Sequence, residues 1–143
     1  MILDKLETVV KKYVDVFQIC VLLLVGAITT VPSVVVVAPS FLQRLYGVTP
    51  TDPVQLALLQ HRGVFFGIIG GGLILSAFRR SLRETFITIA LVAKLCFVGI
   101  VYLHPGVTEQ LGGIAIIDLV AIVLLLTVLI AQHSVHKADD AKA

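Results

Sequence analysis

The chain has 143 residues, of which 58% are hydrophobic and 14% are charged. Soluble domains carry about 45–50% apolar and about 25% charged residues, so this composition excludes an ordinary soluble domain and indicates that the chain folds in a lipid bilayer. The net charge is only +2, and the basic residues are not interleaved with aromatic ones as in nucleic-acid-binding surfaces. We therefore expect the lipid bilayer as a partner and no nucleic acid.

Residues 2–15 are the first predicted element, an amphipathic helix. Apolar side chains recur at helical spacing from Ile2 onward, and acids and lysines fill the opposite face. Such a helix lies in the membrane interface, where we expect it to serve as an anchor; docking of a partner is the alternative. The segment mixes acids with bases and precedes an apolar run longer than that of a signal peptide, so we expect the chain to retain it.

Four apolar stretches follow, each close to the length of about 20 residues that a helix needs to cross a bilayer. They cover residues 16–38, 54–78, 85–103 and 112–131, and a polar tail follows over 133–143. We expect one integral membrane domain over 1–143. Its fold class is all-α, a four-transmembrane-helix antiparallel bundle with an N-terminal amphipathic interfacial helix.

Local signals refine this pattern. Pro32 removes a backbone N–H inside the first span, so a kink is expected near residues 28–32. In the first loop, residues 41–46 are apolar enough for a short interfacial helix or turn. Asp52 and Pro53 then suit the N-cap and the first position of the second span.

Three glycines of the second span, Gly63, Gly67 and Gly71, are spaced four residues apart. Small residues at this spacing share one helix face and let another helix approach closely. We expect helix packing within the bundle, with contact between subunits of a homo-oligomer as the alternative.

Basic residues are concentrated on one side of the predicted membrane. They precede the first span, separate the second from the third and follow the fourth, whereas the first and third loops contain only Arg44. Cytoplasmic loops are enriched in Lys and Arg, so the N- and C-termini should be cytoplasmic. The residues that carry this signal are Lys5, Lys11, Lys12, Arg79, Arg80, Arg83, Lys137 and Lys142.

Arg62, Lys94 and Asp118 place charges inside apolar stretches, where each costs about 2.5–3.5 kcal/mol on insertion scales. Counting along the spans puts them and His61 about 9–13 Å from the outer ends of their helices. Charged side chains from three helices at one depth indicate a polar cluster in the outer half of the bilayer. Asp118 is its only acid, and its natural partners are Arg62 and Lys94.

The excess positive charge of this cluster suits an anionic or strongly hydrogen-bonding ligand, such as a lipid headgroup, a fatty acid, or the oxygen of a quinone or ketone. Gln60 and Tyr102 would add polar contacts. Two other interpretations stay open: ion pairs that only hold the bundle together, and movement of protons or ions, for which His61 is a candidate carrier.

The remaining residues identify no metal, disulfide or cofactor. Cys20 and Cys96 differ in depth by about 10 Å or more, so we expect free, buried thiols. His133 and His136 are three residues apart, but no further ligand accompanies them, so no metal site is expected. No nucleophile–base pair, phosphate loop or CxxC motif is evident, and the cofactors are unknown.

One loop-to-helix pattern is distinctive: LYGV at 45–48, DP at 52–53 and LLQHRG at 58–63, followed by AFR at 77–79. Over about residues 45–118 the chain resembles small bacterial four-helix integral membrane proteins of unknown function, of DoxX-like or DUF4345-like architecture. The resemblance implies a four-helix bundle in the bacterial inner membrane, with His61 and Arg62 as the polar pair of the pattern. Some relatives in the wider architecture are linked to redox enzymes or bind hydrophobic small molecules.

These observations lead us to expect a non-catalytic membrane protein that binds a lipophilic or anionic-headed small molecule. The ligand would lie in an outer-half pocket where Arg62 and Lys94 attract its head, Asp118 holds their side chains and His61 forms a hydrogen bond. One alternative is an accessory or structural subunit of a larger membrane complex. The other is a membrane enzyme that acts on a quinone- or sterol-like substrate, with His61 as acid or base.

Overall fold

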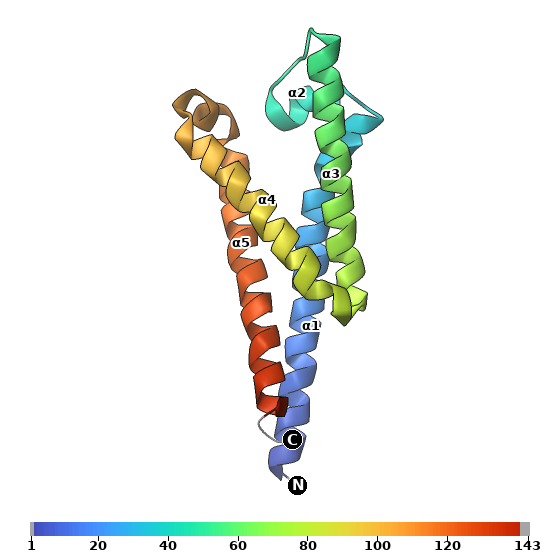
Figure 1. The fold of residues 1–143 in the computed structure, drawn as a ribbon, viewed down its shortest axis with the longest axis vertical. Coiled ribbons are helices and arrows are strands. Elements are labelled where there is room, and N and C mark those ends of the chain that lie inside the picture. Colours follow the sequence, from blue (N-terminus) through green and yellow to red (C-terminus); the bar gives the residue numbers. More distant parts are fainter. Residues whose placement is uncertain (1, 141–143) are drawn as a thin grey trace.

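The computed structural model describes residues 2–140, with side chains described over 8–134. Every element in the described range is helical, which confirms the all-α prediction (Figure 1). The α-helices are α1 (Ile2–Thr30), α2 (Phe41–Tyr46), α3 (Pro53–Phe78), α4 (Arg83–Leu103) and α5 (Pro105–Asp140), and the short 3₁₀ helices are η1 (Val31–Val36) and η2 (Arg80–Leu82).

Four helical segments are long and apolar enough to cross a membrane: Thr8–Val36, Pro53–Phe78, Arg80–Leu103 and Pro105–Ser134. They correspond to the four predicted spans. By helix length and composition, the chain is therefore an integral membrane protein.

Two long helices extend beyond the predicted boundaries. α1 runs without interruption from Ile2 to Thr30, so the amphipathic segment 2–15 is not a separate helix that turns into the first span. α5 begins at Pro105 and continues to Asp140, so it includes the third loop and much of the predicted tail 133–143. Residues 141–143 lie outside the described range, and an interfacial position of residues 2–15 stays a prediction.

Pro32 marks the change from α1 to the tighter turn of η1, within the region where a kink is expected. Its ring has no backbone N–H and therefore cannot continue the α-helical hydrogen-bond ladder. Two residues before Pro32, the Thr30 hydroxyl donates to the carbonyl oxygen of Gly26 at 2.9 Å.

The connection from η1 to α3 has the two features expected from its sequence. The short helix α2 lies over residues 41–46 and ends at Gly47, whose φ of 65° is readily adopted only by glycine. Asp52 caps α3 by accepting a hydrogen bond from the Val54 N–H at 3.0 Å, with Pro53 in the first helical position. These caps fix how α2 returns the chain to α3.

Glycines of α3 let α1 and η1 approach closely. A Cβ on Gly63 would lie 2.9 Å from a Val35 methyl group, and one on Gly67 would lie 3.2 Å from Ser33. Gly71 is exposed, and a Cβ there would meet nothing within 4 Å, so its expected packing is absent within this chain. Gly70 packs against α1 instead: a Cβ on Gly70 would lie 2.7 Å from the carbonyl oxygen of Gly26.

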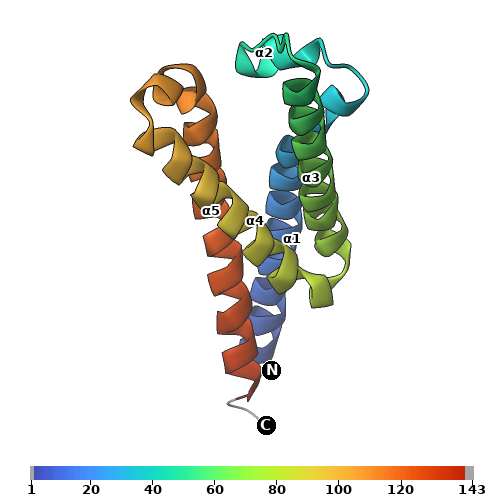
Figure 2. The same cartoon turned by 45° about the horizontal axis from the view of Figure 1, so that its top comes forward.

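A hydrophobic core joins α1, α3, α4 and α5. Figures 1 and 2 show that α1 and α3 form one pair and α4 and α5 another, and that the pairs diverge toward the end of the molecule that carries α2. The start of α1 and the end of α5 lie at the opposite end. The fully buried members of the core are Leu22, Leu73, Ile87, Ala90, Leu125 and Val128.

A polar cluster around Arg83 reinforces the closed part of the bundle. The Arg83 side chain is 4% exposed, and its guanidinium donates to Asp15 at 2.9 Å and to Gln18 at 2.7 Å. It also donates to the carbonyl oxygens of Ser76 and Ala77 at 3.1 and 2.9 Å, where α3 ends and leaves carbonyls without helical partners. One residue of α4 therefore holds α1 and the end of α3 together.

Candidate functional site

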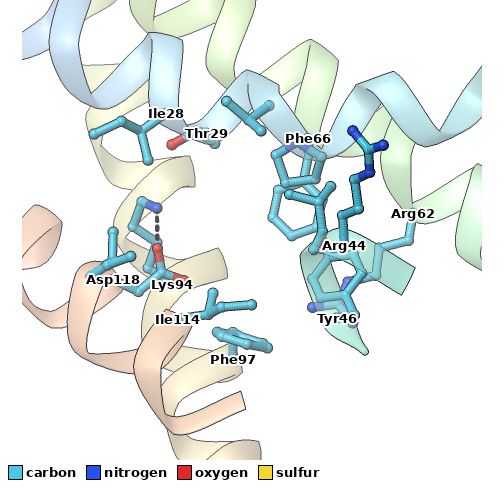
Figure 3. Close-up of a pocket in the computed structure, with 14 residues that line it drawn as sticks. Ile28, Thr29, Arg44, Tyr46, Arg62, Phe66, Lys94, Phe97, Ile114 and Asp118 are labelled. Atoms are coloured by element: carbon cyan, nitrogen blue, oxygen red, sulfur yellow. Dashed lines mark hydrogen bonds and ion pairs between the residues drawn. The ribbon is translucent and has the colours of Figure 1, made fainter. Parts of the chain in front are cut away.

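The divergence of the two helix pairs leaves a cavity of about 250 Å³ between them. Figure 3 shows residues of α4 and α5 on one side of this space and residues of α2 and α3 on the other. Most of the lining is apolar. Its polar and charged members are Thr29, Arg44, Tyr46, Arg62, Lys94 and Asp118.

Lys94 of α4 and Asp118 of α5 form an ion pair on one side of the cavity. Lys94 Nζ lies 2.5 Å from Asp118 Oδ1, and the two side chains are 6% and 13% exposed. Charges removed from water are stabilised only when they are paired and hydrogen-bonded, which accounts for their meeting here. This pairing is one of the two expected from the sequence.

Arg62, the other expected partner of Asp118, forms no ion pair with a described side chain. Its guanidinium carbon instead lies 5.3 Å from the ring centroid of Phe66 and 5.2 Å from that of Phe97. These are cation–π distances, and Phe97 belongs to α4, across the cavity from α3. Arg62 therefore faces the cavity between two aromatic rings and keeps its positive charge uncompensated by any described acid.

Two further polar residues reach the cavity from α2, and the sequence gives only a weak signal for either. Arg44, the single basic residue of the first loop, lies over the Phe41 ring at 5.3 Å. Tyr46 lines the same cavity, and burial, assisted by the charge of Asp118 and opposed by that of Arg62, raises the pKa of its phenol above the usual 10.0. At neutral pH the phenol is therefore protonated and able to donate a hydrogen bond.

A second cavity, of about 420 Å³, adjoins the first between α3 and α4. Arg62, Phe66 and Phe97 line both cavities, and the other residues of the second one are apolar apart from Cys96. The polar space and the apolar space therefore meet at the guanidinium of Arg62. The remaining lining residues are Phe65, Ile69, Ala93, Ile100, Val101, Val107 and Leu111.

Three of the residues predicted for the pocket lie outside both cavities. His61 is exposed and packs edge-on against Phe65, with ring centroids 4.8 Å apart. Gln60 donates to the carbonyl oxygen of Val36 at 3.1 Å and thereby ties α3 to the end of η1. Tyr102 is 51% exposed. Successive helical residues point about 100° apart, so side chains next to Arg62 in sequence do not share its direction.

The cysteines and histidines add no second site. Cys20 and Cys96 are free, as expected, but both are exposed rather than buried, and Cys96 lines the second cavity. Among the described residues no group of three or more His, Cys, Asp or Glu side chains could hold a metal ion, and the side chain of His136 lies outside that range.

The fold and the site define a class: a helical integral membrane protein with a charged cavity between two diverging helix pairs. Comparison of the chain with known protein families, with curated proteins and with solved structures finds no significant match in any of them. The resemblance to proteins of DoxX-like or DUF4345-like architecture therefore stays a prediction.

Proposed function

We propose that this is a non-catalytic, four-span antiparallel membrane protein that binds a lipophilic molecule with an anionic or hydrogen-bonding head. The head lies in the polar cavity, and the apolar part lies in the adjoining cavity between α3 and α4. The observation that carries this proposal is the junction at Arg62, where a cationic space and an apolar space meet between Phe66 and Phe97.

The charge balance of the polar cavity favours an anionic head. Three cations and one acid line it, which gives a formal charge of 3 − 1 = +2. Lys94 and Asp118 compensate each other, so the excess belongs to Arg44 and Arg62. A guanidinium presents a planar fork of donors that matches carboxylate and phosphate groups, and both arginines are exposed and therefore accessible to a ligand.

The apolar cavity explains why the ligand is lipophilic. Binding sites for small molecules are mostly apolar spaces of about 300–1,000 Å³ with a few polar groups that orient the ligand. The second cavity, of about 420 Å³, has this character, with the Arg62 guanidinium at its boundary with the first. A fatty acid, a lipid or a quinone-like molecule has the required combination of chain and head.

The membrane placement is also part of the proposal. Basic residues flank the end of the bundle that holds the termini, as expected for a cytoplasmic side in a bacterial inner membrane. The cavity then lies in the outer half of the bilayer. An accessory subunit of a larger complex remains the alternative. An enzyme that uses His61 in this cavity gains no support, because His61 lines neither cavity.

Binding of radiolabelled oleate to the purified protein in mild detergent tests the proposal. Loss of one charge-assisted hydrogen bond costs about 1.5–3 kcal/mol, which corresponds to a rise in Kd of about tenfold or more. We expect this loss for Arg62→Gln. The matched control is Arg79→Gln, which removes an exposed guanidinium at the α3–α4 connection and should leave the Kd unchanged. Equal affinity of the two variants for oleate would contradict the proposal.

A further inference from the structure

One buried polar atom in this region has no partner. The Thr29 side chain belongs to a residue that is only 5% exposed, and its hydroxyl oxygen forms no hydrogen bond with any described group. The next residue, Thr30, behaves in the ordinary way for a helical threonine and donates to a carbonyl four residues earlier, that of Gly26. Thr29 instead lines the polar cavity. Buried hydroxyls are nearly always hydrogen-bonded, so an unpartnered one calls for an occupant.

The neighbours of Thr29 across this space also have unused hydrogen-bonding capacity. Lys94 has three N–H donors, one of which is directed to Asp118 Oδ1, and no other acceptor for them lies among the described groups. Asp118 Oδ2 likewise has no donor among the described groups. Figure 3 shows the Thr29 oxygen directed toward the space beside the Lys94–Asp118 pair.

The space between these three residues is of the right size for one oxygen atom. A small chamber of about 10 Å³ is lined by Thr29, Lys94 and Asp118, together with apolar residues of α3 and α4. This is near the lower limit of the volume that holds a single water molecule, and a water needs two to four polar partners, roughly the number present. The same three residues also line the larger polar cavity.

We propose that Thr29, Lys94 and Asp118 form a subsite for a single oxygen atom. Lys94 donates to this oxygen and Thr29 either donates or accepts, whereas Asp118 accepts from it only when the oxygen carries a hydrogen, as the oxygen of water does. The oxygen belongs to a water molecule or to the head of the bound ligand. As a part of the ligand pocket, the subsite rests on the proposed function; as a water site, it stands without it.

The sign of the stability change in Thr29→Val tests the subsite. Valine keeps the shape of threonine and removes the hydroxyl. If the hydroxyl is paired with an oxygen, its removal strands that oxygen and should lower the melting temperature by about 3 °C or more. If the hydroxyl has no partner, its removal relieves an unsatisfied polar group and should leave the melting temperature unchanged or raise it.

The measurement uses the full chain in detergent, heated and then assayed by size-exclusion chromatography, without and with saturating oleate. Thr127→Val is the control, because Thr127 is exposed on α5 and its hydroxyl already donates to the Val123 carbonyl. Thr29→Ser, which keeps the hydroxyl, should lose less than Thr29→Val, since it gives up only a methyl group.

Each outcome decides the question. A fall beyond that of the control without oleate supports the subsite with water as its occupant, even if oleate fails to bind anywhere. A fall that appears only with oleate, together with a Kd raised about threefold or more, supports the subsite with a ligand oxygen. An unchanged or higher melting temperature in both conditions would overturn the subsite while leaving oleate binding at Arg62 intact.

Discussion

The Lys94–Asp118 pair decides the charge of the cavity. Both groups are nearly buried, and the pairing distance of 2.5 Å makes them compensate each other locally. A buried pair of this kind adds little net stability, because the attraction mostly offsets the cost of removing two ions from water. Removal of one partner is different, since it leaves the other charge buried and alone. The pair therefore leaves the two guanidinium groups as the net charge that a ligand meets.

The difference between the intact pair and a single unpaired charge gives the first stability prediction. Asp118→Asn should destabilise the protein by about 3 kcal/mol, because it leaves the Lys94 ammonium without a counter-charge. Glu109→Gln is the control, since Glu109 is exposed. The two melting temperatures, measured in the same detergent, should differ by several degrees. The double variant Lys94→Met/Asp118→Leu should recover most of the loss; equal melting temperatures for the two single variants would rule out the pairing.

The depth of these residues in the membrane was predictable from the sequence, but the direction in which their side chains point around the helix was not. The rise of about 1.5 Å per helical residue allows depth to be counted along a span, and this counting brought Lys94 and Asp118 to one level. The direction of a side chain around the helix depends on how neighbouring helices rotate and pack. An all-apolar span gives little sign of that rotation, so His61 was assigned to the pocket with Arg62. Thr29 carries no charge, and its sequence context beside Pro32 indicates a helix kink rather than a place in the pocket.

Among the elements, the contact of α1 with α3 depends most on backbone proximity. Gly26 and Gly70 face each other so closely that a methyl group on Gly70 would collide with backbone atoms, which cannot move aside as a flexible side chain can. Gly71, one position further along α3, points away from every described neighbour. Adjacent glycines of one helix therefore have opposite roles, and only one of them is part of the interface.

Alanine substitution of these two glycines should have opposite effects. Gly70→Ala should destabilise the protein by about 1–3 kcal/mol or more, through overpacking against backbone. Gly71→Ala should be neutral or stabilising by up to about 1 kcal/mol in the isolated chain, because alanine is the better helix former. Melting temperatures in detergent measure both effects. A lower melting temperature for Gly71→Ala than for Gly70→Ala would contradict the observed register.

Local sequence signals predicted the short elements well and the ends of the long helices less well. Pro32, Asp52 and Pro53 act through their own backbone chemistry, so the end of α1 and the start of α3 were expected where they occur. Polar residues do not stop a helix by themselves. α1 therefore continues through the amphipathic segment, and α5 continues through positions assigned to a loop and a tail.

The whole molecule combines a closed end with an open one. The hydrophobic core and the Arg83 cluster hold all four long helices together on one side of the cavity, while the helix pairs separate on the other (Figure 2). Charged residues line the resulting space: Arg44 of α2 and Arg62 of α3 face the Lys94–Asp118 pair of α4 and α5. The number of spans and the class of fold were predictable from hydropathy. The divergence of the pairs was not, because it depends on which helix faces pack.

An experimental structure of the protein in lipid nanodiscs tests this account most directly. We predict elongated density for a lipid or fatty acid between α3 and α4, with its head within hydrogen-bond distance of the Arg62 guanidinium and its chain along Phe65 and Ile100. In Arg62→Gln this density should be lost or displaced. The proposed function would be contradicted if the space between the helix pairs were closed by direct helix contact, or if it held only water with no amphiphile beside Arg62.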